Sequence, residues 1–276
     1  MNMQGSATGI CRDRPFQPNP RVVDIIKTRN IVTRTASLMS FDHVVITAAN
    51  ARQAAGYRAQ LDWRLARGVL DPSCDYAVVA DPNGHRVGSL GATLNVLRLL
   101  AEQLGKIDPA ADAESLFTDK RILICHSGGD SRRLPAYAAQ GKVFAPLPTS
   151  HHGIPATLFD LILANAERLP APARGQVLIY VGDVLLTFDP EAVDFDQPGI
   201  VGVAYPGSME TGSRHGVYVA SDHATQGGCL PVRDFLQKPD EATAAEAGAI
   251  DPVGRVLIDT GILSFDPPTT AKLLKA

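Results

Sequence analysis

Short apolar runs rich in β-branched residues alternate with longer stretches of helical spacing through the first two thirds of the chain. The runs that we expect to form buried parallel strands are 43–47, 76–80, 121–125 and 177–181. The stretches with helical spacing are 51–67, 92–104 and 157–169. This alternation predicts an α/β fold in which a mainly parallel sheet is covered by helices.

The pattern changes after Gly199. Shorter apolar runs, separated by loops rich in Gly, Ser and Asp, cover 200–204, 216–220 and 255–258. They predict short antiparallel strands added to the sheet, so a single α/β unit with a mixed sheet accounts for residues 41–276. Residues 1–40 begin with a Gly-, Asn-, Arg- and Pro-rich stretch, and we expect a largely disordered tail with no catalytic role.

Composition and charge narrow the class of protein. The chain has 276 residues, 45% hydrophobic and 20% charged, which is enough to build a sizeable core. Its 26 basic and 29 acidic residues give a net charge of −3, which argues against a nucleic-acid partner. No apolar run approaches the roughly 18 to 20 residues of a membrane span, and the first residues lack the apolar centre of a signal peptide. We therefore expect a soluble cytoplasmic protein with no membrane partner.

The strongest local signal is the segment HSGGDSRRLPAYAAQGK, which directly follows the third predicted strand. Ligands of open α/β sheets bind at the carboxyl ends of the strands, where this segment begins. Gly128 and Gly129 allow backbone N–H groups to face an anion. Arg132 and Arg133 offer planar, always charged donors for phosphate, and Lys142 adds a further cation. The segment indicates a polyphosphate site, and the alternative is a glycine turn followed by two solvated arginines.

A second glycine-rich element, GSLGAT, lies between the second predicted strand and the helix that comes after it. The first N–H groups of a helix have no partner within the helix and attract anions, so Gly88, Gly91 and Thr93 are candidate nucleotide contacts. The element lacks the GK[ST] ending of a P-loop. The alternative is that these small residues allow tight packing of the helix.

Asp183 is the candidate metal ligand. The run 177–181 delivers Gly182 and Asp183 to the same carboxyl edge of the sheet, and carboxylate oxygens suit Mg²⁺. The alternative is an aspartate that caps a helix or turn. The four cysteines stand far apart without metal-ligand spacing and are expected to be free thiols.

The sequence GGDSRRLP, followed by Gly-Lys, resembles the GGxGTRLxP…K signature of sugar-nucleotide pyrophosphorylases. Arg133 takes the place of the signature arginine, while Ser131 and Arg132 stand where the signature has Gly and Thr. The longer phrases at 46–61, 81–97 and 122–148 resemble the fucose pyrophosphorylase half of bifunctional L-fucokinase/GDP-L-fucose pyrophosphorylases. This resemblance spans roughly residues 42–266.

The resemblance implies a GT-A/Rossmann-like nucleotidyltransferase domain over residues 41–276, cut short at its C-terminal end. The implied reaction transfers GMP from GTP to L-fucose 1-phosphate, giving GDP-L-fucose and pyrophosphate, with Mg²⁺ as cofactor. It also implies roles for single residues. Arg133 would hold the leaving pyrophosphate and Lys142 the α-phosphate or the sugar phosphate, with Ser131 and Arg132 in the nucleotide loop. Asp183 would hold the metal.

Two later motifs resemble the sugar side of the same family. The sequence FLQKP is similar to F-x-E-K-P, with Gln237 in place of Glu, and implies that Lys238 reaches the sugar phosphate. The sequence DTGI is similar to N-T-G-I and implies that Thr260 and Gly261 line the sugar pocket. Without the family, Lys238 is equally well explained as a surface lysine, and the Thr-Gly pair as a simple turn.

Two other functions stay open at this point. Members of the family continue well beyond the T-G-I motif, so the chain could be a non-catalytic fragment that binds nucleotide or sugar phosphate. A sugar kinase fits poorly because no ATP-type loop with its own catalytic base is visible in the sequence. The resemblance does imply that a fucokinase domain or protein could supply the substrate.

Overall fold

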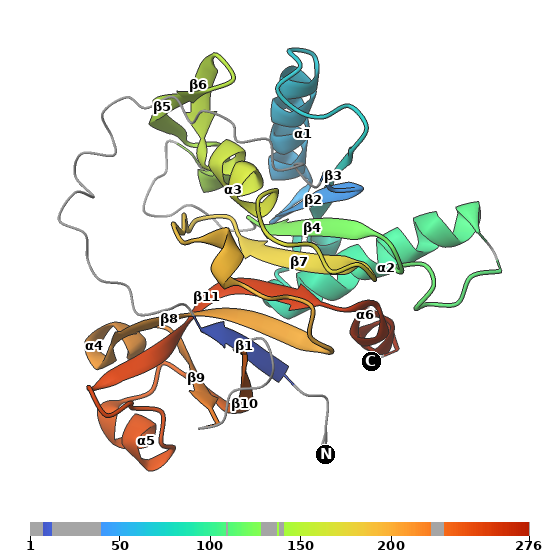
Figure 1. The fold of residues 1–276 in the computed structure, drawn as a ribbon. Coiled ribbons are helices and arrows are strands. Elements are labelled where there is room, and N and C mark those ends of the chain that lie inside the picture. Colours follow the sequence, from blue (N-terminus) through green and yellow to red (C-terminus); the bar gives the residue numbers. More distant parts are fainter. Residues whose placement is uncertain are drawn as a thin grey trace.

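One mixed sheet organises the molecule. The structure is a computed structural model and describes residues 8–12, 40–108, 110–127, 137, 141–221 and 229–275. Nine strands from these residues form the sheet, in the order β3-β2-β4-β7-β11-β8-β1-β10-β9. Figure 1 shows the sheet running through the middle of the molecule with helices on both sides. The α/β class expected from the sequence is confirmed.

The first half of the sheet is parallel. Its strands are β2 (His43–Ala48), β3 (Asp75–Ala80), β4 (Arg121–His126) and β7 (Gln176–Val181). β2 pairs with β3 and with β4, and β4 pairs with β7, each in parallel register. Ile122, Leu123 and Ile124 in β4 are fully buried, because a strand of this kind is covered on both faces. All four predicted strands are present, and their carboxyl ends meet at one edge.

Helices cover both faces of this parallel half (Figure 1). They are α1 (Ala51–Leu65) and α3 (Leu158–Ala166) on one face, and α2 (Gly88–Ile107) and α6 (Pro267–Leu273) on the other. Successive strand residues face opposite layers, so Val44 and Ile46 pack with α1 and α3 while Val45 packs with α2. None of the described helices is long and apolar enough to cross a membrane.

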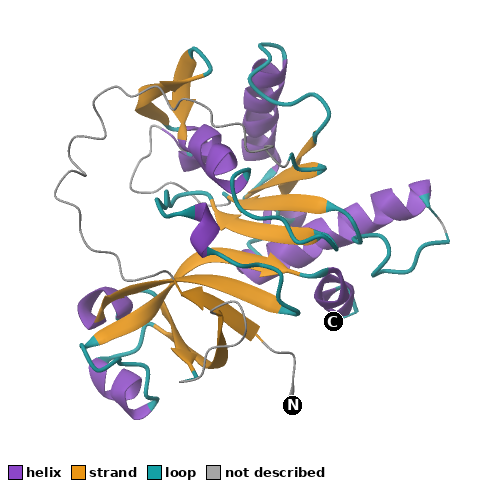
Figure 2. Ribbon diagram, in the orientation of Figure 1, coloured by secondary structure: helices purple, strands orange, loops and turns teal. Residues whose placement is uncertain are grey.

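The second half of the sheet is mostly antiparallel (Figure 2). Its strands and short helices are β8 (Ile200–Ser208), α4 (Met209–Gly212), β9 (Gly216–Ala220), β10 (Cys229–Gln237), α5 (Glu241–Glu246) and β11 (Arg255–Phe265). β11 pairs antiparallel with β7, β8 and β9, and so joins the two halves. The runs predicted at 200–204 and 255–258 are longer than expected, and β10 was not predicted at all.

One strand lies inside the stretch expected to be a tail. β1 (Thr8–Arg12) pairs in parallel with β8 and antiparallel with β10. These five residues form a strand where a tail was predicted. Their local sequence has no strand pattern, and the strand forms because it pairs with two neighbouring strands. Residues 1–7 and 13–39 lie outside the described residues, and the tail stays a prediction there.

Short elements connect the parallel strands to the helices. β5 (Pro146–His151) and β6 (Ile154–Thr157) form a separate two-stranded sheet that leads into α3. Three 3₁₀ turns, η2 (Pro82–Gly84), η4 (Lys142–Phe144) and η5 (Pro190–Ala192), complete the described elements. η4 is the turn most relevant to function, because it begins at one of the candidate site residues.

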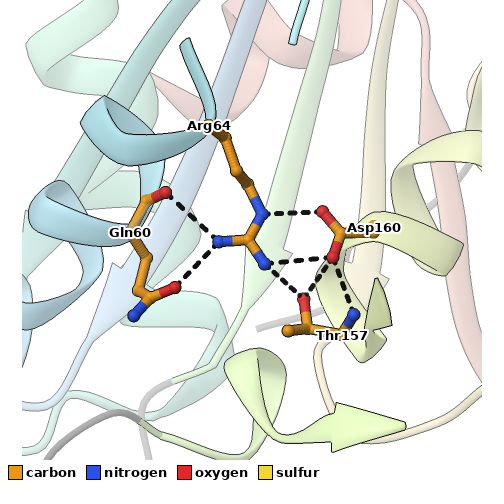
Figure 3. A network of polar contacts seen from close by, with 4 residues as sticks. All are labelled: Gln60, Arg64, Thr157 and Asp160. Atoms are coloured by element: carbon orange, nitrogen blue, oxygen red, sulfur yellow. Dashed lines mark hydrogen bonds and ion pairs between the residues drawn. The ribbon is translucent and has the colours of Figure 1, made fainter. Parts of the chain in front are cut away.

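A buried ion pair ties α1 to the start of α3 (Figure 3). Arg64 donates from Nε to Oδ1 of Asp160 at 2.7 Å and from Nη2 to Oδ2 at 3.0 Å. The remaining Arg64 donors reach Thr157 Oγ1 and two oxygens of Gln60. Burial alone would raise the pKa of Asp160, but the hydrogen bonds from Arg64 and Thr157 hold it below its usual value. Both charges are therefore fully paired inside the protein.

We expect Arg64→Met to lower the free energy of unfolding by about 3 to 5 kcal/mol, because it leaves the Asp160 carboxylate buried without its partner. Urea denaturation of the variant and the unmodified chain measures the difference. Arg214→Met is the matched control, since Arg214 pairs with Glu210 at 2.9 Å on the surface, with 70% and 81% of the two side chains exposed. Equal, small losses in the two variants would contradict the structural role of the buried pair.

Candidate functional site

A pocket of about 310 Å³ opens at the carboxyl edge of the parallel strands. It is lined by the ends of β2, β4 and β7, by the first residue of η4, and by the turn and first residues that begin α2. The lining residues are Thr47, Asp81, Arg86, Gly88, Ser89, Ala92, His126, Ser127, Lys142, Val181, Gly182 and Asp183. Three of the predicted site residues, Gly88, Lys142 and Asp183, therefore face one cavity.

Gly182 allows the ends of β4 and β7 to touch. Its N–H donates to the His126 carbonyl oxygen at 2.7 Å. A Cβ at this position would lie 2.8 Å from that same oxygen and 3.1 Å from the Ser127 Cβ. Only glycine fits without a shift of the backbone, and Asp183 follows it directly into the pocket wall.

Lys142 and Asp183, which are far apart in the sequence, meet in this pocket. Lys142 Nζ lies 3.1 Å from Asp183 Oδ2, and 35% and 55% of the two side chains are exposed. Val143 and Phe144, the next residues in η4, are buried at 0% and 2% exposure and anchor the turn in the core. A cation and a carboxylate therefore meet at a solvent-accessible wall, and the residues that follow the cation are anchored in the core.

His126 also lines the pocket. Its Nε2 lies 2.9 Å from Thr93 Oγ1 and its Nδ1 lies 3.3 Å from Thr47 Oγ1. Burial lowers the pKa of His126 to about 4, so the ring is neutral at physiological pH. From the sequence, His126 is interpreted as a solvated loop residue or as a brace for the glycine loop. The structure places its ring between Thr47 in β2 and Thr93 in α2, while the glycine loop lies outside the described residues.

The start of α2 lines the same pocket as Lys142. Gly88 has φ +72°, and the side chain of the N-cap residue Val87 makes no capping hydrogen bond. The first N–H groups of α2 therefore suit an anion. Gly91 does not line the pocket, and a Cβ there would lie 2.7 Å from the Cβ of Val87, the N-cap residue of the same helix, so its contact favours the packing alternative. Thr93 is 4% exposed and directs its hydroxyl at His126.

Two charged residues in this wall were not among the predicted site residues. Asp81 and Arg86 both line the pocket. Burial raises the pKa of Asp81, against a backbone hydrogen bond from Val87 and the charge of Arg86, which act in the opposite direction. Both lie in the turn between β3 and α2. The sequence of Asp, Pro, Asn and Gly at the start of this segment is typical of a turn, so neither residue was predicted to belong to the site.

The Thr-Gly pair of β11 adjoins the pocket from the antiparallel half. Gly261 has φ +73° in a strand irregularity, and a Cβ there would lie 2.7 Å from a methyl group of Val181, which lines the pocket. Thr260 donates its hydroxyl to the Val203 carbonyl oxygen at 2.6 Å. The pair is thus a bulge inside a strand. Lys238 is exposed at the end of β10, with φ +51°, and does not line this pocket.

The remaining predicted residues are Gly128, Gly129, Ser131, Arg132 and Arg133, and they lie outside the described residues. Their roles stay predictions. Within the part of the chain that is described, no group of three or more His, Cys, Asp or Glu side chains lies close enough together to hold a metal ion.

Fold and pocket define an α/β protein with a pocket lined by charged residues at the carboxyl edge of its parallel strands. The fucose pyrophosphorylase domain model matches residues 114–276, and the chain belongs to that family. It is 35% identical over 249 residues to a bifunctional fucokinase/GDP-fucose pyrophosphorylase of Arabidopsis thaliana, covering 82% of this chain and 23% of the relative. It is 37% identical over 211 residues to a fucose-1-phosphate guanylyltransferase of Mus musculus, covering 72% and 33%. The chain thus spans a third or less of these relatives.

We expect Thr93→Val to lower the free energy of unfolding by about 1 kcal/mol, because it leaves the half-buried His126 Nε2 without its partner while keeping the side-chain shape. Thermal or urea unfolding measures the loss. Thr118→Val is the control, since Thr118 is exposed and its hydroxyl bonds to the Glu114 carbonyl at 3.1 Å. A Thr93 variant as stable as the Thr118 variant would show that the hydrogen bond to His126 is unimportant.

Proposed function

We propose that this chain is a nucleotidyltransferase of the sugar-1-phosphate guanylyltransferase type. It transfers GMP from GTP to L-fucose 1-phosphate, so that a phosphate oxygen of the sugar attacks the α-phosphorus and the bond to pyrophosphate breaks. The observation that carries the proposal is the pair of Lys142 and Asp183, 3.1 Å apart on the wall of the pocket. The names of the relatives support the choice of nucleotide and sugar phosphate.

Charge neutralisation is the main chemical demand of this reaction, since two polyanions must approach in line. The Lys142 ammonium offers a compact positive charge at the pocket wall, suited to the α-phosphate or the sugar phosphate. The free N–H groups at the start of α2, from Gly88 onward, offer a second place for phosphate. We assign the pyrophosphate contact to Arg133, as the signature motif implies.

Asp183 is the proposed Mg²⁺ ligand. Its carboxylate is 55% exposed and faces the pocket, and Mg²⁺ in nucleotide sites is held by one or two carboxylates together with phosphates and water. A single protein carboxylate therefore fits this ion when the nucleotide is bound. Mg²⁺ would neutralise charge on the phosphates, and the role of this chain is to present Asp183 beside Lys142.

The sugar is proposed to lie toward β11, where Gly261 contacts the wall residue Val181. Thr260 and Lys238 are the other proposed sugar-side residues. The name of the Arabidopsis relative includes a fucokinase, and a kinase domain or protein is the proposed source of L-fucose 1-phosphate. Cys74 and Cys125 are free and buried, which fits a reducing compartment, and we propose a cytoplasmic location.

Turnover of the unmodified chain tests the proposal. Pyrophosphate release from GTP should require both L-fucose 1-phosphate and Mg²⁺, and GDP-L-fucose should form in equal amount. Binding of GTP without any pyrophosphate release would instead favour the non-catalytic binding fragment. Release of pyrophosphate without the sugar phosphate would contradict the proposed acceptor.

Asp183→Asn should reduce Mg²⁺-dependent turnover by about 100-fold or more, because it removes the charge and keeps the shape. Stability should hardly change, since an exposed ion pair contributes about 1 kcal/mol or less. Asp62→Asn, an exposed carboxylate on α1, is the control. Retained turnover in Asp183→Asn would defeat the metal role, and GTP binding without metal should survive in both variants.

Lys142→Met should lower turnover by about 100-fold, because it removes a positive charge that acts on the phosphates in the transition state. Lys142→Arg should restore activity only in part, since a planar guanidinium does not replace a compact ammonium. Initial rates at varied L-fucose 1-phosphate measure both. Lys106→Met, an exposed lysine near the end of α2, serves as control. Full activity of Lys142→Met would refute the assignment.

A further inference from the structure

The Tyr57 hydroxyl contacts Ser127, a residue that lines the pocket. Its ring, on α1, is fully buried. Tyr57 Oη donates to the Ser127 carbonyl oxygen at 3.0 Å, and Ser127 Oγ lies 3.0 Å from the same Tyr57 atom. Burial raises the pKa of Tyr57 to about 12, so the group stays a neutral donor and acceptor. One hydroxyl thus fixes Ser127, a residue of the pocket lining, through two hydrogen bonds.

The same side chain contacts the residue before Lys142. Gly141 has φ +66°, and a Cβ there would overlap the Tyr57 hydroxyl and lie 2.6 Å from two ring carbons. The backbone can therefore pass this point only as glycine in a left-handed conformation. Lys142 comes immediately after it, and its carbonyl oxygen accepts from the Ala145 N–H at 3.0 Å, which closes the η4 turn.

The ring and the hydroxyl of Tyr57 make separate contacts. The Tyr57 ring packs against Phe144 at 5.4 Å between centroids, and Phe144 packs against Phe159 at 5.2 Å. These apolar contacts survive if only the hydroxyl is removed. The hydroxyl itself bonds to Ser127, which lines the pocket, and packs against Gly141, which precedes a pocket residue. Removing the hydroxyl therefore loosens the pocket side of Tyr57 and leaves the core side in place.

We propose that the Tyr57 hydroxyl is a positioning group for the transfer reaction, fixing the backbone at Ser127 and Gly141 and thereby the place of the Lys142 ammonium relative to Asp183. The expected effect on kcat rests on the proposed function. The structural consequence, a fixed η4 turn, does not depend on any substrate. Small displacements of a charge that acts on the transition state are costly, so the effect falls on kcat.

Tyr57→Phe tests the proposal. It should lower kcat for pyrophosphate release by about 10- to 100-fold, while KM for GTP changes by about twofold or less. Amide hydrogen exchange at Ala145, measured without substrate, should become about tenfold faster, because the η4 turn opens more often. Thermal unfolding should show that the variant remains folded.

Tyr76→Phe is the matched control. The Tyr76 hydroxyl is also partly buried and forms a hydrogen bond with the Cys74 side chain. Cys74 lies just before the start of β3, whereas the pocket is at the carboxyl ends of the strands. Tyr76→Phe should leave kcat and the exchange at Ala145 unchanged. Equal effects in the two variants, or no effect of Tyr57→Phe on kcat and exchange, would overturn the positioning role. If the unmodified chain shows no turnover, the proposed function fails, and the exchange rates alone then decide whether Tyr57 fixes the turn.

Discussion

The site depends on the close contact between the ends of two parallel strands, β4 and β7. The Gly182 N–H meets the His126 carbonyl oxygen at 2.7 Å, in a space that excludes any side chain at position 182. This contact brings the residues that leave each strand to the same place. It explains why Ser127 and Asp183 share a pocket although more than fifty positions separate them in the sequence. It continues the parallel pairing of β4 with β7, whose last register pair is His126 with Val181.

Lys142 reaches that cavity because α1 supports the turn that carries it. Phe144 packs between the rings of Tyr57 and Phe159, and the Arg64 guanidinium lies 5.0 Å from the centre of its ring. Arg64 in turn is fixed by its buried pair with Asp160 on α3. A polar network deep in one helical layer is thereby connected to a charged group at the pocket wall. A lysine whose backbone is fixed in this way loses less conformational entropy when a ligand binds than a mobile lysine does.

The sequence predicted the parallel half of the sheet well, because strands buried on both faces are continuous apolar runs. It failed for β10, whose Pro231 and charged residues hide the pattern, and for β1, which depends on pairing with distant strands. For the site, strand order was enough to put Asp183 at the right edge. It could not give the contact with Lys142, and Tyr57 looks in the sequence like one more apolar position of a helix. Contacts of this kind depend on how separate helices and strands pack together, which the sequence pattern of each element does not give.

A crystal structure of the chain with GTP and Mn²⁺ tests the central claim most directly, because Mn²⁺ can replace Mg²⁺ at oxygen ligands and is located by its anomalous signal. The account predicts that the metal is bound by the Asp183 carboxylate and that the nucleotide phosphates lie in the pocket between Lys142 and the start of α2. Metal and nucleotide bound elsewhere, with Lys142 and Asp183 still paired at the wall of an empty pocket, would contradict it.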